Sequence, residues 1–262
     1  MKFTTRMAAI AALSTLVVAG CGSSNDTSSS APGSSSAAGG KLMVFAAASL
    51  KKSFTDIGER FETENPGTDV EFTFAGSSDL VTQLTQGAPA DVLASADTGN
   101  MDKAAKADLL AGAPVNFASN TLTIVVAPGN PKKVSSFKDL TQPGLAVVTC
   151  APQVPCGSAT QKVEKATGVQ LNPVSEESQV TDVLTKVTTG QADAGLVYVT
   201  DARGAGAKVT AVAFPESAGA VNTYPIAALK QSTNSPLATK FVDTVTGEIG
   251  EKILAAAGFA KP

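Results

Sequence analysis

The sequence predicts an α/β fold for residues 41–262. Short apolar segments alternate with amphipathic helical segments over this whole stretch, which is typical of sheets covered by helices. Several of the apolar segments are apolar throughout, as expected for parallel strands whose two faces are both covered. The chain has 262 residues, which is enough for one large domain or for two smaller lobes with separate cores.

The strand segments share a high content of apolar and β-branched residues. They are residues 41–49, 69–77, 90–97, 121–129, 145–152, 194–202, 209–216 and 222–229. Segments 121–129 and 222–229 lie about a hundred residues apart, and each could cross between two lobes and form a hinge. We therefore expect lobe 1 to contain about residues 41–121 and 225–262, and lobe 2 to contain about residues 122–224.

The predicted helices between these strands show apolar residues at a spacing of three to four. One apolar face contains Leu50, Phe54, Ile57 and Phe61, and a second contains Val180, Val183, Leu184 and Val187. A C-terminal helical segment contains Leu237, Phe241, Val245, Ile249 and Ile253. The first helix is predicted to end at Asn-Pro-Gly, and the second at Gly190.

Residues 1–20 have the features of an export signal. Lys2 and Arg6 precede an apolar stretch that is too short for a stable membrane-spanning helix. Small residues then precede Cys21, in a pattern similar to the bacterial lipobox, which predicts cleavage before Cys21 and a lipid on its sulfur. The alternative is an ordinary signal peptide with a cysteine at this place by chance.

Residues 21–40 consist mainly of serine, glycine and alanine and predict a flexible tether. A lipid, a tether and a folded body predict a protein anchored on the extracytoplasmic face of the cell membrane. Loss of residues 1–20 removes two basic residues and changes the formal charge from −3 to −5, with 18 basic and 23 acidic residues left. This acidic balance argues against nucleic acid as a partner.

Serine recurs where strands meet predicted helices. Ser49, Ser77 and Ser78, Ser158 after Gly157, and Ser178 all stand at such helix starts. Helix N-termini carry unpaired N–H groups and a partial positive charge, so several that converge would form a donor-only site for an oxyanion. The alternative is that each serine caps its own helix, and Ser178 fits that alternative best.

Histidine is absent, which excludes Ser-His and Cys-His catalysis and the commonest metal ligand. Cys150 and Cys156 flank five residues, and in an exported protein they predict a disulfide that stiffens the loop between them. With only these two thiols in the folded body, a direct metal-ion site is not expected. We also expect no cofactor.

Four motifs together are similar to those of one family. "FAAASL", "GAPADV" with the following "SAD", "VPCG" and "GLVY" resemble the molybdate-binding proteins of bacterial ABC transporters, and the resemblance covers nearly all of residues 41–262. It implies a two-lobed type II periplasmic-binding-protein fold with a hinge between the lobes. It also implies binding of molybdate, and of tungstate, by a protein that is not an enzyme.

The resemblance also implies the ligand set. Ser49 and Ser77 would each give a hydroxyl and a backbone N–H to the anion. Cys156 and Val180 would give backbone N–H groups, and Tyr198 would give its hydroxyl. Two features depart from the family pattern or strain it: Cys156 stands where the family commonly has alanine, and the acidic Asp79 lies near the site. Tyr198 also has the alternative of an ordinary buried ring.

The implied protein is a monomer that delivers molybdate to the transmembrane subunits of an ABC permease. A rival with the same fold is a receptor for another oxyanion such as sulfate or phosphate. A rival from another class is a cell-surface serine hydrolase with a Ser-Lys pair, although no "GxSxG" motif is present. A structural lipoprotein whose serines are plain helix caps is the third.

Overall fold

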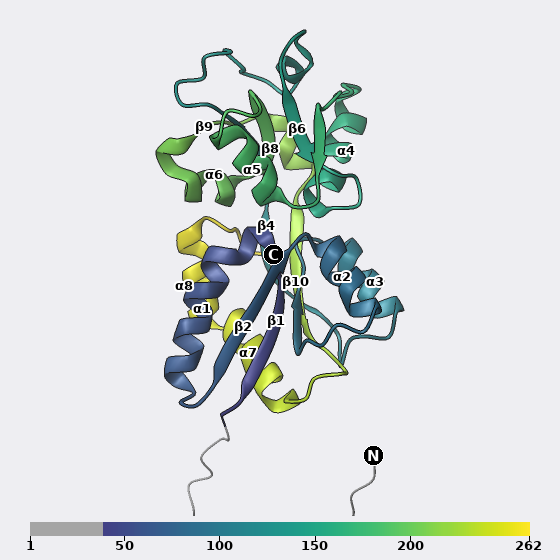
Figure 1. Ribbon diagram of the computed structural model, residues 1–262, viewed down its shortest axis with the longest axis vertical. Helices are drawn as coiled ribbons and strands as arrows, with labels where there is room; N and C mark the ends of the chain where they lie inside the picture. The colour runs from purple at the N-terminus through teal and green to yellow at the C-terminus, as the bar shows by residue number, and fades with distance from the viewer. Residues whose placement is uncertain (1–38) are drawn as a thin grey trace, which may run out of the picture. The chain divides into compact units, whose positions relative to one another are not determined.

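Two five-stranded sheets organise the part of the chain that the structure describes, residues 39–262 of this computed structural model (Figure 1). Helices cover both sheets, which confirms the predicted two-lobed α/β fold. The predicted signal peptide, the lipid-bearing Cys21 and all but the end of the predicted tether lie outside the described residues. Within residues 39–262, no helix is both long and apolar enough to cross a membrane.

The first sheet has the strand order β2-β1-β3-β10-β4. Its strands are β1 (Lys41–Ala47), β2 (Asp69–Ala75), β3 (Val92–Ala94), β4 (Val115–Asn120) and β10 (Asn222–Ala228). Strand β1 pairs in parallel with β2 and β3, as predicted. Strand β10 runs antiparallel to β3 and to β4, so the sheet is mixed.

The second sheet has the order β7-β6-β8-β5-β9. Its strands are β5 (Leu122–Val126), β6 (Val147–Cys150), β7 (Ser175–Glu177), β8 (Ala194–Tyr198) and β9 (Thr210–Val212). Strand β6 is parallel to β7 and β8, while β5 is antiparallel to β8 and β9. The prediction of purely parallel sheets is therefore wrong for β5 and β10. Each of these strands enters its sheet directly from the other lobe, so no helical crossover sets its direction.

The helices and short 3₁₀ turns follow the strands in sequence. They are η1 (Ala48–Leu50), α1 (Lys51–Glu64), α2 (Ser77–Thr85), α3 (Thr98–Lys106), η2 (Lys138–Thr141), α4 (Pro155–Thr167), α5 (Val180–Thr188), α6 (Val199–Ala205), η3 (Gly206–Lys208), η4 (Pro215–Gly219), α7 (Ser235–Thr246) and α8 (Glu248–Ala257). Helices α1, α7 and α8 cover one face of the first sheet, and α2 and α3 cover the other (Figure 1).

The apolar residues that predict α1 form the centre of the first lobe's larger core. Phe54 and Phe61 are fully buried, and both rings meet Phe241 of α7 edge-on, at centroid distances of 6.2 and 5.2 Å. Leu80, Leu84 and Met101 build a separate core on the opposite face of the sheet. A third core fills the second lobe, so each lobe has its own hydrophobic interior.

The C-terminal segment differs from its prediction as one continuous helical run. It breaks at Gly247, whose backbone is extended, and forms two helices, α7 and α8. Leu237, Phe241 and Val245 are buried before the break and Leu254 is buried after it, while Ile249 is only partly buried. A spacing of four residues over this length drifts around a straight helix, and the break at Gly247 restores contact with the core.

The described chain crosses between the two sheets at two places. The first crossing is Thr121, which follows the last residue of β4 and precedes the first of β5. The second is the pair Ala220 and Val221, directly before Asn222 and β10. The predicted segment 121–129 starts with the first crossing, and segment 222–229 starts directly after the second. The strand in each segment then lies within one sheet. Two adjacent crossings of this kind form a hinge.

Candidate functional site

A small cavity of about 10 Å³ lies where the two lobes meet. It is lined by Ala47, Ala48, Ser49, Ala75, Gly76, Ser77, Ala96, Val154, Pro155, Cys156, Val180 and Tyr198. Most of these residues stand at or just after the carboxyl ends of strands, the edge at which open α/β sheets bind ligands. All five predicted ligand residues line the cavity, two from the first lobe and three from the second.

The first lobe contributes two serines that do not cap their own helices. Ser49 is the middle residue of η1, and Ser77 is the first residue of α2; neither helix start has a side-chain cap. The Ser77 hydroxyl instead accepts a hydrogen bond from the backbone N–H of Ala96, at 3.0 Å. Its own proton therefore remains available to the cavity. The alternative of plain capping is wrong for both serines.

The second lobe contributes the first turns of α4 and α5. Helix α4 begins at Pro155, two residues before the predicted start, so Cys156 is its second residue. Helix α5 begins at Val180 with Gln179 as its N-cap, and no side chain caps it. The prediction that Ser178 caps this helix is therefore wrong. The first N–H groups of α2, α4 and α5 have no partner within their helices, and their dipoles add positive potential at the cavity.

The loop before α4 is held by covalent and steric constraints. Cys150 at the end of β6 and Cys156 in α4 form a disulfide with an S–S distance of 2.02 Å. Gly157 packs against the same loop so closely that an added Cβ would lie 2.0 Å from the carbonyl oxygen of Ala151. These contacts fix the backbone N–H of Cys156 at the cavity wall.

Tyr198 is the last residue of β8, and its side chain is fully buried. Burial raises the pKa of its hydroxyl well above the usual value, so the group stays neutral and keeps its proton. The hydroxyl oxygen accepts a hydrogen bond from the side-chain amide of Asn222, at 3.0 Å. The backbone N–H of Tyr198 donates to the Asp201 carboxylate at 3.0 Å, which fixes the start of α6.

Two further polar residues contact the ligand residues and were not predicted from the sequence. Asn222 and Tyr224 both lie on β10 and are buried, and the Tyr224 hydroxyl is 3.1 Å from the hydroxyl of Ser49. The two side chains stand two residues apart, so they share one face of the strand. Their partners lie 24 and 175 residues away in the sequence. Polar and apolar residues do not alternate along segment 222–229, so no sequence signal indicated this shared face.

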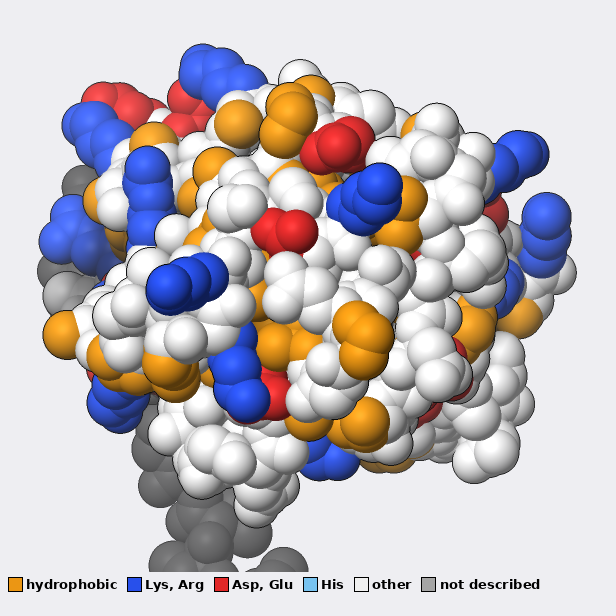
Figure 2. All heavy atoms as spheres, turned by 90° about the horizontal axis from the view of Figure 1, so that it is seen from above, with side chains coloured by type: hydrophobic (Ala, Val, Ile, Leu, Met, Phe, Trp, Pro, Cys, Tyr) orange, Lys and Arg blue, Asp and Glu red, His pale blue; other side chains and the backbone are white. Residues whose placement is uncertain are grey.

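No charged side chain lines the cavity. Asp79 lies in the first turn of α2, is only partly buried and is not among the lining residues. Within residues 39–262, no cluster of three or more metal-ligating side chains occurs. Acidic and basic side chains are interspersed on the face that Figure 2 shows, without a continuous field of one sign. The cavity wall therefore presents neutral hydrogen-bond donors and helix N-termini and no charged side chain.

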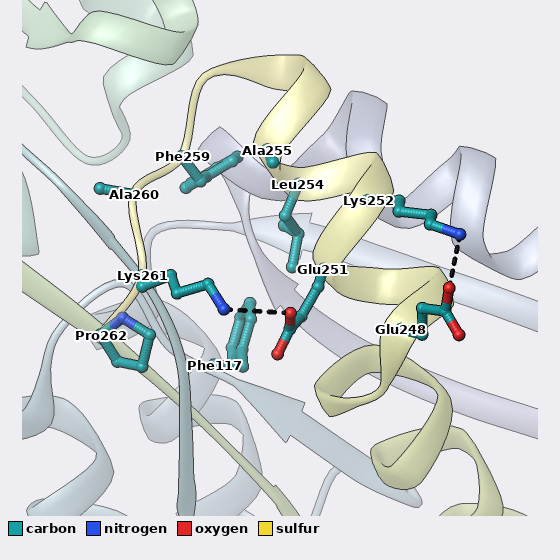
Figure 3. A pocket seen from close by; sticks show the side chains of 10 residues that line it. All are labelled: Phe117, Glu248, Glu251, Lys252, Leu254, Ala255, Phe259, Ala260, Lys261 and Pro262. Carbon is teal, nitrogen blue, oxygen red and sulfur yellow. Dashed lines mark hydrogen bonds and ion pairs between the residues drawn. The ribbon is translucent and has the colours of Figure 1, made fainter.

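Two larger hollows lack this donor set. A groove of about 300 Å³ lies beside the C-terminal residues, and its lysines, Lys252 and Lys261, are paired with Glu248 and Glu251 (Figure 3). Another, of about 720 Å³, lies between the α1 and α8 side of the first lobe and the α5 and α6 side of the second. Ser49 lines both this interlobe groove and the small cavity.

Comparison with known proteins identifies the family. Residues 42–260 match the family model described as bacterial extracellular solute-binding protein. The chain belongs to this family. The molybdate-binding protein ModA of Mycobacterium tuberculosis is 64% identical to this solute-binding protein over 220 residues, which cover 84% of each chain. The recognition made from the four motifs is confirmed.

Solved structures confirm the fold of this solute-binding protein. The periplasmic molybdate-binding protein of Azotobacter vinelandii matches with a TM-score of 0.73 and 22% identity, over 84% of this chain and 99% of that one. The sulfate-binding protein SubI of Mycobacterium tuberculosis matches with a TM-score of 0.74 and 20% identity, over 84% and 86% of the two chains. The backbone fold is thus common to proteins named for different oxyanions, and side chains must distinguish them.

Proposed function

We propose that this solute-binding protein is the extracytoplasmic component of a molybdate ABC importer. It binds molybdate, and also tungstate, and delivers the anion to a membrane permease. The observation that carries the proposal is the convergence of Ser49, Ser77, Cys156, Val180 and Tyr198 on one cavity that offers only neutral donors. The 64% identity to a protein named as molybdate-binding supports the choice of anion.

The proposed binding mode uses both lobes. Hydroxyls of Ser49 and Ser77 from the first lobe, and of Tyr198 from the second, donate to the oxygens of the dianion. Backbone N–H groups of Cys156 and Val180 complete the set, aided by the positive ends of their helices. Because the anion contacts both lobes at once, its binding stabilises the closed arrangement about the hinge.

The donor set also favours some anions over others. Hydrogen phosphate carries a proton that needs an acceptor, and hydroxyls that already donate to the anion do not provide one. Sulfate is fully ionised near neutral pH, so hydrogen bonding does not reject it, and cavity size must separate it from the larger molybdate. A sulfate receptor is the second candidate, because the same neutral donors that line the cavity can satisfy either fully ionised tetrahedral dianion.

The proposal is one of binding without turnover. Serine hydroxyls line the cavity, but the chain has no histidine, and no lysine or acidic side chain lines the cavity to act as a base. We also propose that residues 1–20 are removed, that Cys21 carries the lipid and that the tether reaches to about residue 40. Fatty-acid labelling of the native protein, lost in a Cys21→Ser variant, would test the anchor.

The decisive experiment is a binding panel with molybdate, tungstate, sulfate and phosphate, read by calorimetry and thermal shift. We expect binding of molybdate and tungstate, and a ligand at about a thousand times its Kd should add roughly 4 kcal/mol of stability. Ser49→Ala should weaken this binding, whereas Ser158→Ala, a serine in the first turn of α4 that does not line the cavity, should not. Binding of sulfate alone would overturn the proposed anion and keep the fold.

A further inference from the structure

We propose that Asn222 and Tyr224 are positioning residues that set the direction in which the site hydroxyls donate. Each lies on β10 behind a different ligand residue and supplies a hydrogen bond to it. The hydroxyl that accepts this bond has only its own proton left to offer, and that proton faces the anion. This inference rests on the proposed function and explains why the site accepts fully ionised anions.

The orientation of the Asn222 amide is determined by its neighbours. Its nitrogen lies 2.8 Å from the carbonyl oxygen of Ala96 and 3.4 Å from that of Pro155. Carbonyl oxygens only accept hydrogen bonds, so the NH₂ group, and not the amide oxygen, must face them. The same nitrogen lies 3.0 Å from the Tyr198 hydroxyl oxygen, which therefore accepts. The single proton of Tyr198 must point elsewhere, either toward the neighbouring Tyr224 hydroxyl or toward the cavity that the residue lines, where a bound dianion accepts it.

The pair of Tyr224 and Ser49 follows the same logic once an anion is bound. Their hydroxyl oxygens are 3.1 Å apart, and either group could donate in the free protein. A dianion only accepts, so Ser49 gives its one proton to the anion. The bond between the two hydroxyls must then use the proton of Tyr224. Tyr224 is fully buried, and burial raises its pKa well above the usual value, so that proton is retained.

Asn222 also supports the third hydroxyl. The backbone carbonyl of Ala96 accepts a hydrogen bond from the Asn222 amide, and the backbone N–H of Ala96 donates one to the Ser77 hydroxyl. One side chain thus contacts residues of both lobes, Ala96 in the first and Tyr198 in the second. With an anion bound, each of the three site hydroxyls would have a donor behind it: Tyr224 for Ser49, the Ala96 N–H for Ser77, and Asn222 for Tyr198.

The chemical consequence concerns specificity. A hydroxyl whose oxygen accepts a hydrogen bond from the protein would have to break that bond before it could rotate and accept a hydrogen bond from the ligand. Removal of Asn222 would free the Tyr198 hydroxyl to rotate and to accept a proton from hydrogen phosphate. We therefore expect the Asn222→Ala variant to lose affinity for molybdate by up to about tenfold, the upper end of what one neutral hydrogen bond contributes. Its preference for molybdate over hydrogen phosphate should narrow.

A double-mutant cycle on the full chain tests whether Asn222 acts through Tyr198. The Kd for molybdate is measured for wild type, Asn222→Ala, Tyr198→Phe and the double variant. We expect Asn222→Ala to raise the Kd clearly more in the wild-type background than when the Tyr198 hydroxyl is already absent, because only the support of Ser77 through Ala96 is then left to lose. Equal effects in both backgrounds would mean that Asn222 only holds the lobes together, and this would overturn the proposal.

A second double-mutant cycle pairs Tyr224→Phe with Ser49→Ala. Because phenylalanine keeps the buried ring, this cycle remains informative even if an Asn222 variant folds poorly. The matched control is Asn65→Ala, a buried asparagine at the end of α1 whose amide donates to the Phe61 carbonyl. Its molybdate Kd should equal that of wild type. Failure of wild type to bind any tetrahedral anion would overturn the proposed function itself. Binding by wild type with additive cycles would overturn only the role of Asn222 and Tyr224.

Discussion

Asp201 is an acidic residue that is tied to the site through the backbone of Tyr198. Its carboxylate accepts from the backbone N–H of Tyr198, yet burial raises its pKa from 3.8 to about 7. The charged residues of the interlobe groove around it are Lys51, Lys52, Asp56, Arg203 and Lys208. The folded protein therefore holds a proton on Asp201 over a range of pH in which the unfolded chain has lost it.

We predict from this shift that stability falls as the pH rises. The contribution of Asp201 is fully present below about pH 3.8 and is lost as the pH approaches about 7. The loss is at most about 1.4 kcal/mol per pH unit, so Tm should fall by roughly 5–9 °C between pH 5 and 7. The Tm of the Asp201→Asn variant should change less with pH than the Tm of wild type over this range. Asp139, with a pKa lowered to about 2, titrates below this range. An equal change of Tm with pH in the variant and in wild type would contradict the prediction.

Among single residues, the five that were predicted from local motifs all line the cavity, and their roles as ligands of the anion stay a prediction. Ser49, Ser77, Cys156, Val180 and Tyr198 each sit at a strand end or helix start, and the resemblance supplied their roles. The hydrogen-bond partners behind them could not be predicted in this way. Asn222 reaches Ala96 across 126 residues, and such pairs depend on how the two sheets meet.

At the scale of elements, prediction succeeded where a segment carried its own periodicity. The apolar runs of β1, β5 and β8 and the helical face of α1 are visible in the sequence. Strand β7 was missed because it has three residues, two of them glutamates, and β4 was missed because polar and apolar residues mix along it. The antiparallel placement of β5 and β10 depends on the hinge, which leaves no pattern within either strand.

The disulfide between Cys150 and Cys156 should stabilise both the fold and the binding site. Its disulfide closes a short loop, so the double variant Cys150→Ser with Cys156→Ser should lose roughly 2–3 kcal/mol of unfolding free energy. The same variant should bind molybdate more weakly, because the loop presents the Cys156 N–H to the cavity. Chemical denaturation and calorimetry measure the two effects. Thiol titration of the unfolded, unreduced protein should find neither cysteine free; two reactive thiols from this pair would refute the bridge.

At the scale of the whole described body, closure requires a very close approach of the two lobes at Gly76. An added Cβ at this glycine would lie 2.1 Å from the carbonyl oxygen of Ser178 in the second lobe. The backbone angles of Gly76, φ −61° and ψ 140°, suit any residue, so the requirement for glycine comes from the contact alone. Alanine at this position is compatible with each lobe but not with their closed arrangement.

We therefore predict that Gly76→Ala weakens molybdate binding by at least about tenfold while the unliganded protein melts near the wild-type temperature. Small-angle scattering should show that the variant stays open when molybdate is added. Gly112→Ala is the control, because nothing lies within 4 Å of its added Cβ. An unchanged Kd for Gly76→Ala would show that the lobes can close without this contact.

The uncharged lining of the cavity also determines how ionic strength acts on the protein. Attraction to a dianion resides in short donor contacts and helix ends inside a water-poor cavity, which dissolved salt screens little. The chain as a whole is net negative, with a formal charge of −3, and repels the same ion at long range. Added salt weakens this repulsion and leaves the contacts intact, so capture becomes faster while release keeps its rate. A site built from lysines and arginines would respond in the opposite way and would lose affinity as salt rises.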